Sequence, residues 1–257
     1  MQLFVVCSAA LLASLLTLFS GFGLGTLLLP VLALFFPVPV AIALTAVVHL
    51  LNNLFKLLLL GKFAKRQVVA LFGVPALLGA LVGASLLLAL AQLPVLVTYR
   101  FLGVQRGILP VKVAVALLMI GFVFLEMLPR FRNLAFQPRY LPLGGSLSGF
   151  FGGLSGHQGA LRSAFLINCG LSKEEFLGTG VVIACLVDGA RIAVYGSRFA
   201  SAGIGENGVL LVAATLSAFF GAWLGSRFLH KVTVQAIQLL IATLLFGIAV
   251  GLATGIL

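Results

Sequence analysis

Apolar residues fill this chain in eight long blocks that are separated by short polar breaks. Each block has about 20 residues or more, the length that an α-helix needs to cross the roughly 30 Å of hydrocarbon in a bilayer. The blocks are Leu3–Phe36, Val38–Leu60, Val68–Leu90, Leu109–Leu128, Leu141–Cys169, Phe176–Tyr195, Gly208–Leu229 and Val232–Ile256. The pattern predicts an all-α polytopic membrane protein with about eight apolar segments.

The composition agrees with this interpretation. Hydrophobic residues make up 62% of the chain and charged residues 8%, and the mean hydropathy is +1.26, whereas a soluble domain is near one quarter charged. The net charge of +11 does not indicate nucleic acid, because most basic residues lie in short loops, where membrane proteins carry cytoplasmic anchors. The three cysteines have no metal-binding or redox spacing. We expect no nucleic-acid partner, no metal and no cofactor.

A basic linker divides the chain into halves of similar size. Residues 129–139 contain three arginines and two prolines, and transporters are often built from two structural repeats. We predict a first transmembrane repeat over 1–128, a cytoplasmic linker over 129–139, and a second transmembrane repeat over 140–257.

The first block of each half is too long for one crossing. Leu3–Phe36 has 34 residues, or about 51 Å as one helix, and Leu141–Cys169 is its counterpart. Both blocks contain a glycine-rich stretch, so we expect each repeat to begin with a broken helix. The break allows two arrangements: a kinked helix that crosses once, or a re-entrant hairpin that enters and leaves on one side.

The positions of Lys and Arg favour the re-entrant arrangement. With a single crossing per block, seven basic residues fall on one side and six on the other. With two re-entrant blocks, nine share one side, as expected for a cytoplasmic side. The other side then keeps Arg100, Arg106, Lys112 and Arg198. Each half has three crossings in this arrangement, so the repeats are inverted in the membrane, both termini lie outside and the linker is cytoplasmic.

One glycine motif occurs twice, 135 positions apart, as Gly21–Pro30 and Gly156–Phe165. A glycine-broken apolar segment in matching positions of two halves is typical of a transporter's binding site, since unwound backbone and helix N-termini present N–H groups to anions. Packing between helices is the alternative role for small residues, and we assign it to Gly79, Gly83 and Ala84. The candidate binding residues from the two motifs are Gly21, Gly23, Gly25, Thr26, Gly156 and Gly159.

Polar residues of the second motif supply the candidate anion ligands. Arg162 has no acidic residue within a helical turn, and its planar guanidinium matches the oxygens of sulfonate, sulfite, carboxylate or phosphate. The alternative for Arg162 is a bridge between helices to Asp188. His157 donates to the same anion or relays a proton, or else makes a structural hydrogen bond. The remaining candidates are Gln158, Asn53 and Asn168.

Asp188 and Arg191 lie three residues apart in an apolar block, so they can pair on one helix face. Charges inside a membrane are costly and normally face the interior of a bundle. The pair is either a neutralised structural unit or part of the coupling machinery, since Asp188 or His157 must carry any coupled proton. At the 135-residue offset Asn53 and Lys56 repeat the spacing without the carboxylate, and Lys56 is near enough to the block's end to snorkel.

At these residues the chain resembles the TauE/SafE sulfite-exporter family over nearly its whole length. The resemblance rests on Gly21–Pro30, Ala41–Thr45, Gly61–Phe63 and the glycine-spaced helix Leu77–Gly83. It implies an inner-membrane transporter of small sulfur-containing or organic anions, with paired glycine motifs near the permeation path. The second motif departs from the pattern, because Phe165 stands where the first has Pro30.

The sequence therefore predicts a transporter of small anions that is not an enzyme, with the bilayer as its surroundings. A homo-oligomer is compatible with this prediction. The alternatives are a non-transporting membrane scaffold and an intramembrane hydrolase. The hydrolase requires a serine, Ser155 or Ser163, within hydrogen-bond reach of His157, and His157 in turn in contact with Asp188.

Overall fold

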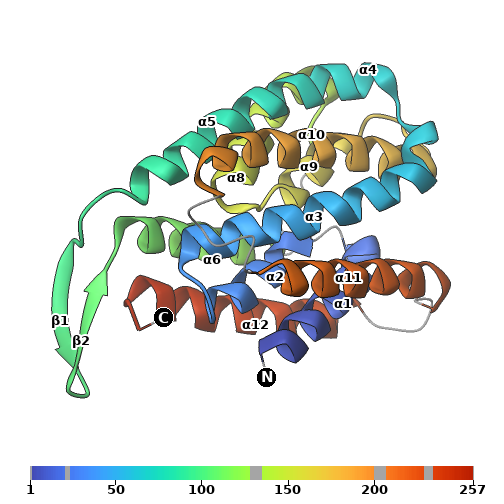
Figure 1. The fold of residues 1–257 in the computed structure, drawn as a ribbon. Helices are drawn as coiled ribbons and strands as arrows, with labels where there is room; N and C mark the ends of the chain where they lie inside the picture. The colour runs from blue at the N-terminus through green and yellow to red at the C-terminus, as the bar shows by residue number, and fades with distance from the viewer. Residues whose placement is uncertain (1, 21–23, 128–134, 200–206, 229–233, 257) are drawn as a thin grey trace.

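Helices form almost all of the computed structural model, which describes residues 2–20, 24–127, 135–199, 207–228 and 234–256 (Figure 1). Four helices in these ranges are long and apolar enough to cross a membrane. They are Val40–Phe63, Arg66–Leu90, Lys173–Gly196 and Gly208–Gly225. Helix content, length and composition are thus those of a helical membrane protein.

Each half contains the same order of helices: a first helix, a short second helix, and three further helices that are each longer than the second. The first half has α1 (Gln2–Ser20), α2 (Leu24–Ala33), α3 (Val38–Leu60), α5 (Val74–Leu90) and α6 (Pro110–Met127). The second half has α8 (Leu141–Ser155), α9 (Gly159–Leu166), α10 (Lys173–Phe199), α11 (Gly208–Phe228) and α12 (Val234–Ala253). Short helical turns precede α5 and α8, namely η1 (Gly61–Phe63), α4 (Arg66–Val68), η2 (Val69–Gly73) and η3 (Pro138–Tyr140).

Helices of one half pack mainly against helices of the other. The first helix of each half lies on the fourth helix of the opposite half, as α1 on α11 and α8 on α5. The third helices α3 and α10 pack together, and so do the fifth helices α6 and α12. In Figure 1, α5, α8, α9 and α10 form an upper group, α1, α11 and α12 a lower group, and α3 runs between them. Two structural repeats related by a common axis would produce this pairing of helices across the halves. The division of the chain into repeats stays a prediction.

Glycines allow the two exchanged helix pairs to approach closely. A Cβ added to Gly79 or Gly83 of α5 would collide with backbone atoms of α8, and one added to Gly149 of α8 would collide with the carbonyl of Ala76. Gly221 of α11 faces the backbone of α1 in the same way. The packing role expected for Gly79 and Gly83 is confirmed, as small residues at membrane helix interfaces let backbones touch.

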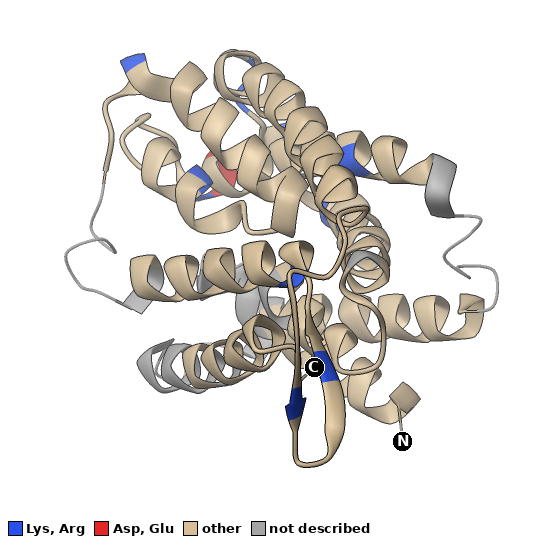
Figure 2. Ribbon diagram, turned by 90° about the vertical axis from the view of Figure 1, so that its left-hand side faces the viewer, with Lys and Arg blue, Asp and Glu red and all other residues tan. Residues whose placement is uncertain are grey.

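A β-hairpin follows α5, and the sequence analysis did not predict it. Strand β1 (Val97–Phe101) pairs antiparallel with β2 (Val104–Ile108), from Val97 opposite Ile108 to Phe101 opposite Val104. The turn residues Leu102 and Gly103 both have positive φ, at 50° and 79°, the conformation of a tight hairpin turn. Figure 2 shows basic residues on both strands of the hairpin, which projects from the helices. The hairpin is a small addition to the all-α architecture that the sequence predicted, and its β-branched and aromatic residues outside the apolar blocks favour strands.

We expect Gly149→Ala to destabilise the protein, because the new methyl group overlaps the backbone of α5 at Ala76. Overpacking of this kind costs about 1–3 kcal/mol. Thermal unfolding of the purified protein in detergent measures the loss. Gly121→Ala in α6 is the matched control, since a Cβ there meets no atom within 4 Å in the described structure. Equal melting temperatures for the two variants would contradict the close approach of α5 and α8.

Candidate functional site

The two glycine motifs meet in the interior of the protein. In the second motif, α8 ends at Ser155 and Gly156 adopts a left-handed φ of 84°, donating its amide to the carbonyl of Gly152. In the first motif Gly25 is buried, and a Cβ added to it would lie 3.5 Å from the carbonyl oxygen of Gly156. Gly159 is buried at the start of α9. Gly21 and Gly23 lie outside the described residues, and Thr26 lies in α2 with its side chain not described.

The second long apolar block is broken at its motif, where α8 ends at Ser155 and α9 begins at Gly159, and a short helix of the first motif, α2, begins at Leu24. Helix α2 has 10 residues and α9 has 8, so they are about 15 and 12 Å long. Neither helix can cross roughly 30 Å of hydrocarbon by itself. The break itself is confirmed for the block that contains α8 and α9; its re-entrant course stays a prediction.

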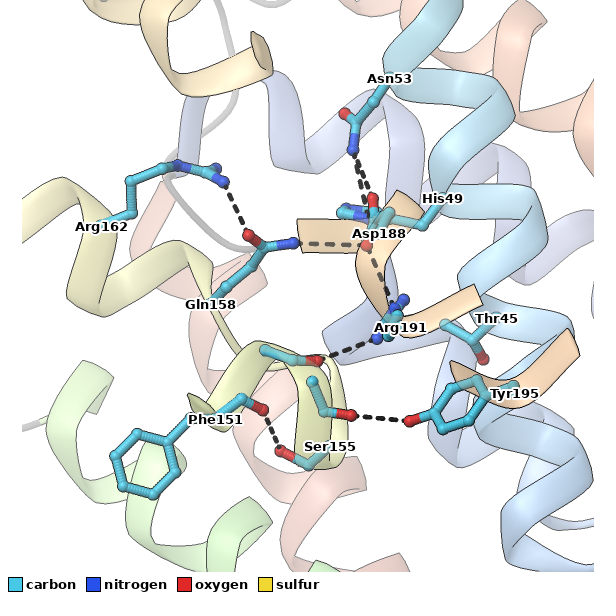
Figure 3. Close-up of polar contacts among 12 residues, drawn as sticks. Thr45, His49, Asn53, Phe151, Ser155, Gln158, Arg162, Asp188, Arg191 and Tyr195 are labelled. Atoms are coloured by element: carbon cyan, nitrogen blue, oxygen red, sulfur yellow. Dashed lines mark hydrogen bonds and ion pairs between the residues drawn. The ribbon is translucent and has the colours of Figure 1, made fainter. Parts of the chain in front are cut away.

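A buried carboxylate connects the break to both halves (Figure 3). Asp188 of α10 is completely buried, and its Oδ2 lies 2.5 Å from His49 Nδ1 and accepts a hydrogen bond of 3.1 Å from Asn53. Its Oδ1 lies 3.2 Å from Arg191 Nε and accepts a hydrogen bond of 3.4 Å from Gln158. One carboxylate therefore holds α3, α10 and the segment between α8 and α9 together. The expected pair of Asp188 and Arg191 is present.

Arg191 and Tyr195 fix the end of α8 against α10. Arg191 Nη1 donates to the carbonyl of Gly152 at 3.2 Å, and the Tyr195 hydroxyl donates to the carbonyl of Gly153 at 2.7 Å. The carbonyl of Gly152 thus accepts both from Arg191 and from the Gly156 amide, and the C-terminal end of a helix carries partial negative charge, which a guanidinium stabilises. A Cβ on Gly156 would lie 2.9 Å from Arg191 Nη1, so glycine leaves room for the arginine.

Arg162 lies beside this network without an ion pair of its own. Its Nη1 donates to Gln158 Oε1 at 3.4 Å, and in the described ranges no carboxylate lies within 4 Å of it. Gln158 stands between the two charges, because its amide nitrogen donates to Asp188 and its oxygen accepts from Arg162 (Figure 3). The direct bridge from Arg162 to Asp188, the alternative that the sequence left open, is absent from the described structure.

His157 lies in the break between α8 and α9, where it is buried and stacks on an aromatic ring of α6. Its Nδ1 lies 3.1 Å from Ser155 Oγ, and its ring is parallel to Phe122, with centroids 5.3 Å apart. Because the Ser155 hydroxyl donates to the carbonyl of Phe151, Nδ1 is the donor to Ser155. His157 Nε2 has no partner within the described part of the chain, and in the neutral ring it is an acceptor that cannot donate to an anion.

The geometry required for a hydrolase is incomplete. A serine does contact His157, but the hydroxyl proton of Ser155 is directed to Phe151, away from the histidine. Asp188 contacts His49, and among the described contacts none joins Asp188 to His157. The third member of a nucleophile–base–orienter set is therefore missing.

Other site residues differ from the sequence expectation in two ways. Asn168 is exposed in the turn after α9, so the structure does not bring it into the buried group. His49, which the site prediction omitted, makes the shortest contact to Asp188. Its i, i+4 spacing from Asn53 was the available signal, because residues four apart share a helix face.

The fold and the site together define a helical membrane protein whose halves meet at a buried, polar, charged centre beside the break between α8 and α9, the architecture of a membrane transporter. The chain belongs to the sulfite exporter TauE/SafE family, whose family model matches residues 6–252. The family is one of membrane transporters and not of enzymes. Comparison with curated proteins and with solved structures gives no significant match.

We expect Asp188→Asn to destabilise the protein strongly, because Arg191 is then a buried cation without its counter-charge. Breaking a buried pair by removing one partner costs about 3–5 kcal/mol. The double variant Asp188→Asn/Arg191→Gln recovers part of the loss, as thermal unfolding of the four proteins of the cycle measures.

Glu175→Gln is the control for this cycle. Glu175 lies 3.6 Å from Lys65, and both side chains are partly exposed, at 32% and 55%, so removal of the charge costs at most about 1 kcal/mol. A loss for Asp188→Asn no larger than that of Glu175→Gln would show that Asp188 does not stabilise the fold as a charge.

Proposed function

We propose that the protein transports small anions, with sulfite, sulfonates or related sulfur-containing and organic anions as its substrates. The observation that carries this proposal is Arg162, a cation at the junction of the two glycine motifs without a carboxylate partner in the described structure. Membership of the sulfite exporter family supports the substrate class.

The chemistry around Arg162 suits an oxyanion. A guanidinium has five N–H donors in a planar fork that matches the oxygens of sulfite or sulfonate in pairs. Among the described residues the guanidinium of Arg162 makes one hydrogen bond, to the neutral oxygen of Gln158, which leaves most of its donors available to a ligand there. The N-terminus of α9 at Gly159 begins three residues before Arg162, and unpaired N–H groups at a helix start add to the attraction for an anion.

Transport by alternating access fits the way in which the two halves interlock. Gly25 belongs to the first half and Gly156 and Arg162 to the second, so an anion held at the junction is held by both. Rocking of one half against the other then changes which side of the membrane the site faces. Asp188 is bonded to both halves, through His49 of α3 and through Arg191 of α10, and in this mechanism it is the group that carries a coupled proton.

The proposed setting is a cell inner membrane, with the basic linker 129–139 on the cytoplasmic side and both termini outside. Reporter fusions test this orientation: a reporter that is active only outside the cytoplasm is expected to work at either end of the chain and to fail in the linker. Activity of a cytoplasmic reporter at both termini would reverse the orientation.

We expect Arg162→Ala to abolish anion binding and transport while the protein remains folded. A ligand that binds the folded state raises its stability by about 2.7 kcal/mol at 100 times its Kd. The measurement is the melting temperature of the purified protein with sulfite, thiosulfate, sulfate, sulfoacetate, taurine or short carboxylates, followed by flux into proteoliposomes for each anion that stabilises it.

Arg66→Ala is the matched control, because Arg66 is an exposed arginine at the start of α4. It is expected to keep both the stabilisation and the flux. Unchanged anion binding in Arg162→Ala would remove Arg162 from the site, and an absence of stabilisation by every anion in the wild-type protein would contradict the anion site itself.

A further inference from the structure

The β-hairpin between α5 and α6 has one apolar and one polar face. Successive side chains of a strand point to opposite faces, and residues that pair across two strands share a face. In the observed register the apolar face includes Val97, Tyr99, Phe101, Val104 and Arg106, and the polar face includes Arg100 and Gln105. Such a division is unusual for a loop that only connects two helices, and it indicates that the two faces meet different surroundings.

The base of the apolar face rests on the end of α12. Tyr99 donates its hydroxyl to the carbonyl of Thr254, and Arg106 Nη1 donates to the carbonyl of Ile256 at 2.8 Å. A Cβ added to Gly255 would collide with the backbone of β2. The apolar face is therefore turned toward the helices, and the polar face is turned away from them.

Beyond these contacts the apolar face is uncovered in the part of the chain that the structure describes. Phe101 is 46% exposed, Val104 is 50% exposed, and Leu102 in the turn is 87% exposed. Leu58, which lies within the membrane span Val40–Phe63, is 85% exposed. The tip of the hairpin thus presents apolar surface as fully as a membrane-spanning helix does, and contiguous surface of this kind marks a contact with protein or membrane.

The hairpin lies where the membrane-spanning part of the chain ends. It follows the span Arg66–Leu90 after a short connection. In Figure 1 its strands run across the direction of α3 and α12, at the end of the fold where α12 finishes. Membrane helices lie on average about 20° from the bilayer normal, so an element that runs across them extends along the membrane surface. Its apolar face is then directed to the lipid around the helix ends.

The charge of the hairpin suits a layer of phospholipid headgroups. Residues 91–110 contain Arg100 and Arg106 and neither Asp nor Glu, and Figure 2 shows these basic residues on the two strands. Basic residues beside an apolar face are typical of elements that lie in the interfacial region of a membrane. Two hairpins of this protein carry the same positive charge, which disfavours their pairing with each other.

We propose that the hairpin is an interfacial anchor whose apolar face lies in the headgroup region of the phospholipid bilayer, with Phe101, Leu102 and Val104 reaching the acyl chains. The apolar faces of such elements sink roughly 5–10 Å into the boundary between headgroups and acyl chains. The polar face then remains in water. Through Tyr99 and Arg106 the anchor also holds the end of α12 at the membrane surface. The inference depends on the membrane setting of the protein and not on its proposed substrates.

Tryptophan fluorescence tests the anchor, because the chain has one tryptophan, Trp223, which can be removed. In a Trp223→Phe background, Phe101→Trp places a probe on the apolar face, and Gln105→Trp places the matched probe on the polar face. The full chain is reconstituted in nanodiscs of phosphatidylethanolamine and phosphatidylglycerol, with or without brominated phosphatidylcholine. Quenching of each probe by the brominated lipid and by aqueous iodide is then measured.

We expect the brominated lipid to quench the probe at position 101 about twofold or more as strongly as the probe at 105, because a ring in the boundary region contacts acyl chains and not water. Iodide is expected to show the reverse order. Melting temperatures equal to that of Trp223→Phe alone show that the probes leave the fold intact. If Phe101→Trp fails to fold, Leu102→Trp replaces it, since a side chain that is 87% exposed has little packing to lose.

Two results would overturn the anchor. Equal quenching of both probes by iodide, without quenching by the brominated lipid, places the tip of the hairpin in water. Protection of position 101 from both quenchers, together with a dimer in size-exclusion chromatography, shows that a second copy of the chain covers the apolar face. Neither result depends on anion binding, so the anchor and the proposed function stand or fall separately.

Discussion

The need to neutralise one buried carboxylate organises the centre of this protein. Asp188 is the only aspartate in the chain, and it is completely buried in a segment where an unpaired charge would be strongly unfavourable. Four side chains from both halves satisfy its two oxygens. The relative positions of α3, α10 and the break after α8 are therefore not independent, because each supplies part of the same shell of donors.

Glycine makes this arrangement possible in two physically different ways. Along α8, glycines such as Gly149 remove side chains so that the helix lies against the backbone of α5. At the end of α8, Gly156 adopts a left-handed backbone conformation that residues with a side chain rarely adopt. The absence of a Cβ at Gly156 also leaves space for Arg191. The same helix is thus packed tightly along its length and ended sharply beside the charged centre. Helix α8, which ends at the break, therefore also lies in direct backbone contact with α5.

The features that the sequence predicted depend on local spacing or on internal repetition. The pair of Asp188 and Arg191 follows from an i, i+3 spacing, and the break after α8 follows from glycines inside a block longer than a membrane crossing. The long-range contacts could not be predicted in this way. His49 meets Asp188 across 139 residues of sequence, and only the packing of α3 on α10 brings them together.

Asn168 has the polarity of a ligand, but it lies beyond the end of α9 and is exposed. The hairpin was missed because its two strands of five residues each lie in a gap between apolar blocks, where a membrane pattern has no signal.

Gln158 determines whether Arg162 is available to a ligand. A carboxylate at this position would neutralise the guanidinium, and an apolar residue would leave both Asp188 and Arg162 without a hydrogen bond that they now make. The neutral amide satisfies one oxygen of Asp188 and one nitrogen of Arg162 and leaves the charge of the arginine intact. In the proposed function, an anion that pairs with Arg162 through Nη1 competes with the Gln158 oxygen for that donor. Loss of that bond acts on the other end of the amide, and hence on the carboxylate that joins the two halves. If anions bind as proposed, Gln158 links the site to the packing of α3 on α10, which is the physical requirement for a site whose occupancy biases the arrangement of two halves.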